Sequence, residues 1–228
     1  MQLKRARLLR DRRGAAFIEF ALGLPVLLMA GLYGLELTRY SLVNQKLSQI
    51  ALNLADNASR VGLMSGQGTV QLREADLNDV LQAARFQGNS IGLTTNGRIT
   101  LSSLENSGGT QKIHWQRCLG LQRGAGWDSS YGTTDPSDGT TTNAADAGTP
   151  APSGMGDSGA MVNAPTNSGV MFVEINYQYT PLVGNGWIAN TRKLHFIASF
   201  VVRDNRDFAQ IYNPSPAATR STCDRYTS

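Results

Sequence analysis

The stretch that decides the fold is RRGAAFIEFALGLPVLLMAGLYG, residues 12–34. Residues 20–35 carry no charge and, at 1.5 Å per residue, span about 24 Å as a helix, somewhat less than a ~30 Å hydrocarbon core. The ~20 residues that a membrane span needs are reached only by including Glu19 or Glu36. A carboxylate in lipid costs roughly 3 kcal/mol on insertion scales, so Glu19 calls for an explanation.

The charges around this stretch predict an orientation. Residues 1–14 contain six basic residues and one acidic residue, a net charge of +5, whereas the whole chain has +4, which leaves −1 for the remainder. The positive-inside rule then places the N-terminus in the cytoplasm and the rest of a single-pass protein outside. Because the net positive charge is confined to this leader, no basic surface suited to nucleic acid is expected.

Three kinds of N-terminus fit these features. A secretory signal peptide would end in a small-x-small cleavage site, but the helical pattern continues without interruption. A plain signal anchor would hold a periplasmic or envelope binding module, with Glu19 tolerated as a boundary residue. The third possibility is a leader that is cleaved off, followed by a helix in which Glu19 has a function.

The third possibility rests on a resemblance. Gly14-Ala15-Ala16-Phe17-Ile18-Glu19-Phe20 resembles the cleavage motif of type IV prepilins, and its G-x-x-x-x-E-F core with the long helix resembles TadE-like minor pseudopilins of tight-adherence (Flp) pilus systems. The C-terminal stretch DNRDFAQIYNPSPAATRSTC is also similar to members of that group. Alanine at position 15, where many type IV pilins carry phenylalanine, separates the chain from ordinary type IVa pilins.

The resemblance implies an organisation and a set of partners. Residues 1–14 would be a basic prepilin leader, residues 15–40 a transmembrane helix in the bacterial inner membrane, and residues 41–228 an exported, periplasmic domain. A prepilin peptidase would cleave between Gly14 and Ala15 on the cytoplasmic face, with possible N-methylation of Ala15. The implied partners are other pseudopilins and pilins and the pilus assembly platform, and the implied role is assistance in pilus assembly.

Physical chemistry agrees with a role for Glu19 in subunit docking. Cleavage would create an α-amine at Ala15, one helical turn from Glu19, and a neighbouring subunit's amine could pair with the carboxylate. A paired carboxylate costs much less in low dielectric than an unpaired one, so pairing would bias subunits into register.

The helix is expected to continue to about Arg60. Apolar residues recur there at helical spacing: Leu47, Ile50, Ala51, Leu54, Ala55, Ala58 and Val61. Pro25 lacks an N–H, so either a kink or local unwinding near residues 21–25 or an undisturbed membrane-helix proline is expected. Glycines at 62, 66 and 68 then end the helix.

The remaining pattern predicts an α+β domain with a small, mainly antiparallel sheet. A second helix is expected over residues 74–86, and strands over 98–104, 111–119, 170–180 and 194–203. Residues 170–180 alternate between apolar and polar side chains, which predicts a half-buried strand. Turn residues Gly184, Asn185 and Gly186 predict a hairpin between the last two strands.

Residues 124–169 are expected to form a long, solvated or mobile loop. The stretch has five aspartates, no Lys or Arg, and abundant Gly, Thr, Ser, Asn, Ala and Pro, so it cannot bury much apolar surface. Asp135, Asp138 and Asp146 offer oxygen ligands for calcium, but the stretch lacks EF-hand spacing. A partner-binding loop is the other alternative.

The two cysteines, Cys118 and Cys223, are expected to form a disulfide if the domain is exported. The bridge would close a loop of about 100 residues, worth at most about 4–5 kcal/mol of loop-closure entropy. No C-x-x-C motif indicates a redox pair.

No catalytic motif points to an enzyme. His114 and His195 are the only histidines; His195 is expected to be exposed and His114 to lie at a strand edge. The sequence has no H-E-x-x-H, G-x-S-x-G or phosphate-binding loop in the required context, and no cofactor or metal is expected.

Overall fold

The structure, a computed structural model, describes residues 14–183 and 190–228. The chain divides into two compact units: residues 1–42 with 180–191, and residues 43–179 with 192–228, here called the head. The elements in chain order are α2 (Ala15–Arg60), β1 (Leu63–Met64), β2 (Val70–Gln71), α3 (Glu74–Gly88), η1 (Asn89–Ile91), α4 (Leu93–Asn96), β3 (Gly97–Ser107), β4 (Thr110–Leu119), η2 (Ala144–Asp146), β5 (Thr149–Pro150), β6 (Ser168–Tyr179) and β7 (Arg192–Val201).

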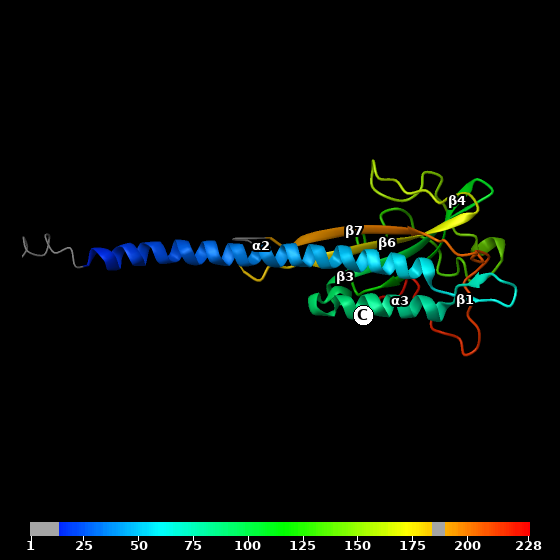
Figure 1. The fold of residues 1–228 in the computed structure, drawn as a ribbon, viewed down its shortest axis with the longest axis horizontal. Coiled ribbons are helices and arrows are strands. Elements are labelled where there is room, and N and C mark those ends of the chain that lie inside the picture. The colour runs from blue at the N-terminus through cyan, green and yellow to red at the C-terminus, as the bar shows by residue number, and fades with distance from the viewer. Residues whose placement is uncertain (1–13, 184–189) are drawn as a thin grey trace, which may run out of the picture. The chain divides into compact units, whose positions relative to one another are not determined.

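The first part of α2, blue in Figure 1, is an apolar helix whose large apolar side chains are exposed. Phe17 is 76% exposed and Leu22 and Leu27 are each 71% exposed. Of the described helices, α2 is long and apolar enough to cross a membrane, and none of its most apolar window is buried. The helix continues unbroken through Pro25, so of the two alternatives considered there local unwinding does not occur; one missing N–H does not outweigh the rest of the helical hydrogen-bond ladder.

The second part of α2 belongs to the head and is buried along one stripe. Leu47 and Ala55 are fully buried, as the helical spacing predicted. The helix ends at Arg60, which confirms the predicted boundary, and Gly62 follows with φ 152°. The buried Arg206 guanidinium donates to the carbonyl groups of Ala58, Ser59 and Val61, which have no intrahelical partners.

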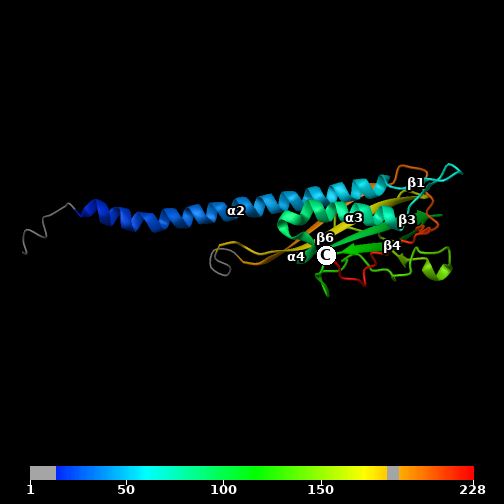
Figure 2. The same ribbon diagram turned by 90° about the horizontal axis from the view of Figure 1, so that it is seen from below.

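The head contains a five-stranded antiparallel sheet in the order β5-β4-β3-β6-β7. Its four long strands and the helix α3 confirm the predicted elements, with boundaries moved by a few residues. Strands β6 and β7 pair as expected of a hairpin, from Val170 opposite Val201 to Tyr179 opposite Arg192. The predicted turn residues of this hairpin, Gly184–Gly186, lie outside the described residues. Within the head, α3 and the second part of α2 lie on one side of this sheet (Figure 2). The α+β fold class is therefore confirmed.

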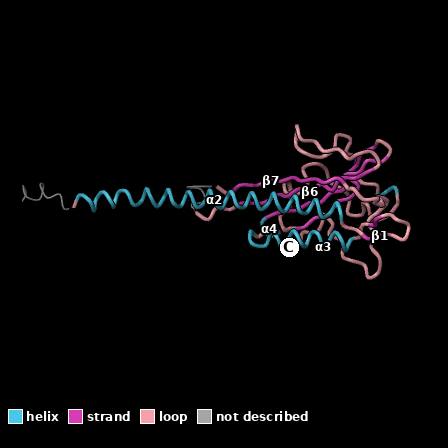
Figure 3. The backbone as a smooth tube through the Cα atoms, viewed as in Figure 1, coloured by secondary structure: helices cyan, strands magenta, loops and turns pink. Residues whose placement is uncertain are grey.

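The opposite side of the sheet is covered over much of its area. The prediction of a half-buried strand at residues 170–180 is wrong, because Phe172, Glu174 and Asn176 are each 1% exposed. Long loop segments pack against this side (Figure 3). Phe172 and Val170 join Ala151, Met155 and Ala164 of the 124–169 segment in one buried cluster. The segment is thus a long loop, largely exposed as predicted, whose few apolar residues pack against the sheet.

Candidate functional site

The N-terminal motif lies at the start of α2. The Gly14 carbonyl oxygen accepts a hydrogen bond from the Ile18 N–H at 3.1 Å, and Ala15 is the first helical residue. A Cβ added at Gly14 would meet no heavy atom within 4 Å among the described residues. The packing of the described chain therefore does not require a glycine at position 14.

Glu19 lies one helical turn after Ala15, on an exposed stretch of apolar helix. In residues 14–183 and 190–228, no group forms a hydrogen bond or ion pair with its carboxylate. The neighbouring apolar side chains, Ile18 and Phe20, are 60% and 63% exposed. In a membrane, a carboxylate without a partner is costly.

Glu36, in the same unit, is in the opposite situation. Its side chain is buried, with 4% of the residue exposed, and Oε2 accepts hydrogen bonds from the backbone N–H groups of Leu182 at 3.1 Å and Val183 at 3.4 Å. Arg39, less than one turn later, donates to the Thr180 carbonyl oxygen at 3.5 Å. From the sequence, Glu36 is only a boundary of the apolar run, because nothing in the sequence links it to a segment 146 residues away.

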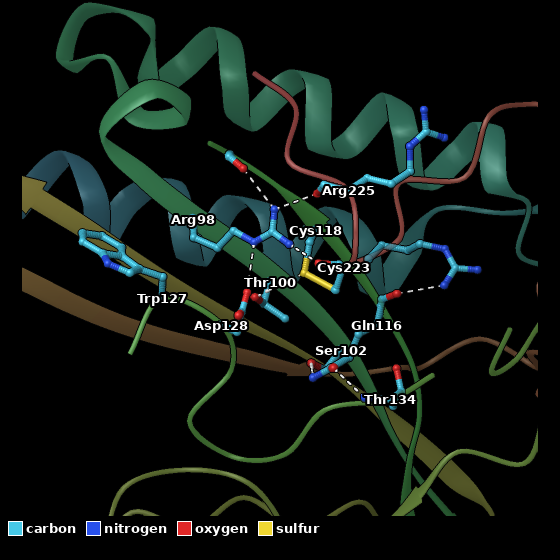
Figure 4. Close-up of a disulfide and its surroundings, with 12 residues drawn as sticks. Arg98, Thr100, Ser102, Gln116, Cys118, Trp127, Asp128, Thr134, Cys223 and Arg225 are labelled. Carbon is cyan, nitrogen blue, oxygen red and sulfur yellow. Dashed lines mark hydrogen bonds and ion pairs between the residues drawn. A yellow bond between two sulfur atoms is a disulfide. The ribbon is translucent and has the colours of Figure 1, made fainter. Parts of the chain in front are cut away.

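Cys118 and Cys223 form a disulfide, with their Cα atoms 4.8 Å apart and a sequence separation of 105. The C-terminal tail runs along the outer edge of β4, where Cys118 N–H donates to Ser221 O and Gly120 N–H to Thr227 O, both at 2.7 Å. The bridge therefore fastens the tail to the sheet where the backbone already pairs (Figure 4).

A buried arginine beside the disulfide holds the same tail. Arg98 is fully buried and donates to the carbonyl oxygens of Cys223 at 2.5 Å, Arg225 at 2.9 Å and Gly120 at 3.0 Å (Figure 4). Asp128 lies 3.6 Å from its Nε. Burial lowers the pKa of Arg98 from its usual value, and the Asp128 charge opposes this shift. The sequence analysis missed Arg98, since an alternating strand pattern does not distinguish a covered polar face from a solvated one.

The polar face of the sheet supplies hydrogen bonds to the backbone of the 124–169 segment. Gln116 donates to Gly132 O at 2.9 Å and accepts from Thr134 N–H at 3.1 Å. Glu174 accepts from Ser130 N–H with both oxygens at 3.1 Å. Buried polar side chains thus stabilise a segment that has few apolar residues of its own.

The aspartates considered for calcium are engaged with their own loop. Asp138 accepts from the N–H groups of Asp135 at 2.7 Å and Gly148 at 3.0 Å, and Asp146 accepts from the Thr141 hydroxyl. In the part of the chain that the structure describes, no group of three or more His, Cys, Asp or Glu residues could hold a metal ion. Hydrogen bonds from the Ser137 backbone and hydroxyl lower the pKa of Asp135.

Both histidines are placed differently from the predictions. His114 is buried, and its Nδ1 lies 2.7 Å from Glu105 Oε2. His195 is partly covered: Nδ1 lies 2.9 Å from Asn176 Oδ1 and Nε2 lies 3.0 Å from the Tyr131 hydroxyl. Burial, with Asp157 as the hydrogen-bond acceptor, raises the pKa of Tyr131. Loop residues cover His195, which explains why the strand pattern alone gave the wrong exposure.

Comparison with known proteins bears on the helix α2 and not on the rest of the chain. Residues 14–61 match the family model described as TadE-like protein. No curated protein and no solved structure matched the chain. The matched residues start at Gly14, include Glu19 and Glu36, and end just after α2. The resemblance drawn from the sequence is therefore confirmed over residues 14–61, the segment that matches the TadE-like model.

Proposed function

We propose that the chain is a minor pseudopilin that assists assembly of a tight-adherence pilus. The coarser part of this statement, a role in a tight-adherence pilus system, follows from the TadE-like match. The observation that carries the finer part is Glu19: an exposed carboxylate on an apolar helix, without a partner in the described chain. A structural pilus component, rather than an enzyme, fits such a family member.

Processing comes first in the proposed mechanism. A prepilin peptidase cleaves after Gly14, removes the +5 leader and exposes the Ala15 α-amine. The open space around Gly14 supports this step, because a glycine that the described chain does not need for its own packing is free to be recognised by another protein. Removal of 14 of 228 residues leaves 214, a size that suits a minor component with a folded head.

Docking follows processing. The helix α2 is held in the inner membrane, and Glu19 pairs with the α-amine of a neighbouring pseudopilin or pilin at the assembly platform. Such a pair offsets much of the desolvation cost of both charges and favours one register between subunits. The head lies in the periplasm, an oxidising compartment that suits the Cys118–Cys223 disulfide.

The test is the mass of the mature N-terminus in protein purified from native membranes. Ala15 as the first residue supports the proposal, whereas an intact Met1 supports the plain signal anchor of an envelope module. Gly14→Val should block processing by crowding the scissile bond. Gly34→Val is the matched control, because Gly34 also lies in open space in this chain and processing there should be normal. Normal processing of Gly14→Val would refute cleavage by recognition of this glycine.

A further inference from the structure

We infer that Leu182, at the base of the β6–β7 connection, contacts the outer boundary of the bilayer, and that Glu36 holds it there. This inference rests on the membrane-spanning role of α2 in the proposed function. The occupant of the exposed Leu182 surface is the phospholipid bilayer itself. The inference concerns one compact unit, because Glu36 and residues 180–183 belong together.

The depth of Glu36 follows from helix geometry. The uncharged residues 20–35 rise about 24 Å, less than the ~30 Å of hydrocarbon, so the residues flanking them lie at or just inside the two boundaries. Glu36 is the first residue after this run on the outer side. The Leu182 nitrogen, 3.1 Å from Glu36 Oε2, therefore lies at the same depth.

The contact between Glu36 and the connection after β6 satisfies polar groups on both sides. A carboxylate at the hydrocarbon boundary has little water, and two backbone N–H groups replace that water. The connection after β6, in turn, would leave these N–H groups unsatisfied in lipid, and the carboxylate satisfies them. Pro181, which has no N–H, is buried beside them.

The Leu182 side chain then faces the only apolar medium at that depth. It is 65% exposed in the chain, although its backbone is fixed by Glu36. At the outer boundary an exposed leucine side chain contacts lipid rather than water, which is favourable for apolar surface. The Arg39 side chain, beside the same connection, carries a positive charge that suits the phosphate groups of the headgroup region.

Fluorescence quenching in lipid vesicles tests the inference with the full chain. Single cysteines at three exposed leucine or methionine positions, Leu182→Cys, Leu27→Cys and Met64→Cys, are labelled with an environment-sensitive fluorophore while the native disulfide stays oxidised. The vesicles are phosphatidylcholine and phosphatidylglycerol, with nitroxides near the headgroup or deep in the acyl chains. Position 182 should be quenched at least about twofold more by the shallow nitroxide than by the deep one, as expected at the boundary of a ~30 Å core. Position 27 should show the opposite preference, and position 64 little quenching.

The outcomes separate the two claims. Deep quenching at position 27 without quenching at position 182 overturns the inference and leaves the membrane anchor in place. Absence of quenching at position 27 overturns both.

The role of Glu36 is tested in the Leu182→Cys background. Glu36→Leu should reduce the shallow quenching at least about twofold, because the boundary N–H groups lose their acceptor. Glu36→Gln keeps an acceptor oxygen and should retain the quenching. Equal quenching in both Glu36 variants would refute the role of Glu36.

Discussion

Glu19 and Glu36 are two carboxylates on one helix, 17 residues apart, with opposite surroundings. Glu36 is buried and accepts two backbone hydrogen bonds from its own chain, whereas Glu19 is exposed and has no partner in the described residues. Burial of a charge is tolerated when hydrogen bonds compensate it. The chain thus satisfies one acid internally, and the difference supports the proposal that Glu19 pairs with a second molecule.

The largest expected effect comes from Glu19→Gln. The substitution removes the charge with little change in size, so a neighbouring α-amine in the membrane would lose its counter-ion. Because breaking a buried pair costs about 3–5 kcal/mol, assembled pili should fall by about a hundredfold or more. Counting surface pili by electron microscopy checks this, with the mass of the N-terminus showing that processing persists. Normal piliation in this variant would contradict the proposed difference between Glu19 and Glu36, since Glu19 would then need no partner.

A second prediction concerns the head, whose bonds lie within the chain. Cys223→Ser should lower the free energy of unfolding by about 4 kcal/mol, because the disulfide closes a loop of 105 residues. Denaturant titration of the solubilised protein, followed by tryptophan fluorescence, measures the loss.

Reductant supplies the control for this prediction. It should destabilise the wild-type protein by a similar amount and leave Cys223→Ser unchanged. A variant as stable as the wild type would show that the hydrogen bonds of Arg98 to the tail suffice without the bridge.

The smallest effect is expected at Asp135, an exposed carboxylate with partners in its own chain. Ser137 lowers the pKa of Asp135 from its ordinary 3.8, so the unfolded state binds more protons between the lowered pKa and 3.8. The contribution of Asp135 to the stability of the folded state is present above pH 3.8 and is lost as the pH falls through the lowered pKa. Asp135→Asn should therefore reduce the Tm slightly at about pH 5 and differ less from the wild type in stronger acid. A Tm difference that grows on acidification would contradict this sign.

The elements with strong periodicity could be predicted from the sequence. The helix to Arg60, the second helix and four strands appear where apolar spacing placed them. The unbroken helix at Pro25 and the packed 124–169 segment did not follow from composition, because the helical ladder tolerates one lost bond and because the sheet's own polar side chains order that segment. Burial of Glu174 and His114 likewise depends on the segments that cover their strands, and a local sequence pattern does not predict that cover.

The candidate site was predicted in part. The G-x-x-x-x-E-F motif identified the TadE-like segment, and composition was enough to suggest the cysteine pair. Glu36 was not recognised, since its acceptor role depends on a segment distant in sequence and close only in the fold. Arg98 was missed for the same reason, because the tail that it holds lies more than 120 residues away.

The most direct test of the account is covalent capture of the Glu19 pair in native membranes. A membrane-soluble carbodiimide joins a carboxylate to an amine that is already in contact, and mass spectrometry identifies the linked peptides. The account predicts an amide between Glu19 and the N-terminal α-amine of another subunit, distinguished from a same-chain product by its mass. Glu19 without any link, in a chain that still begins at Met1, would contradict it.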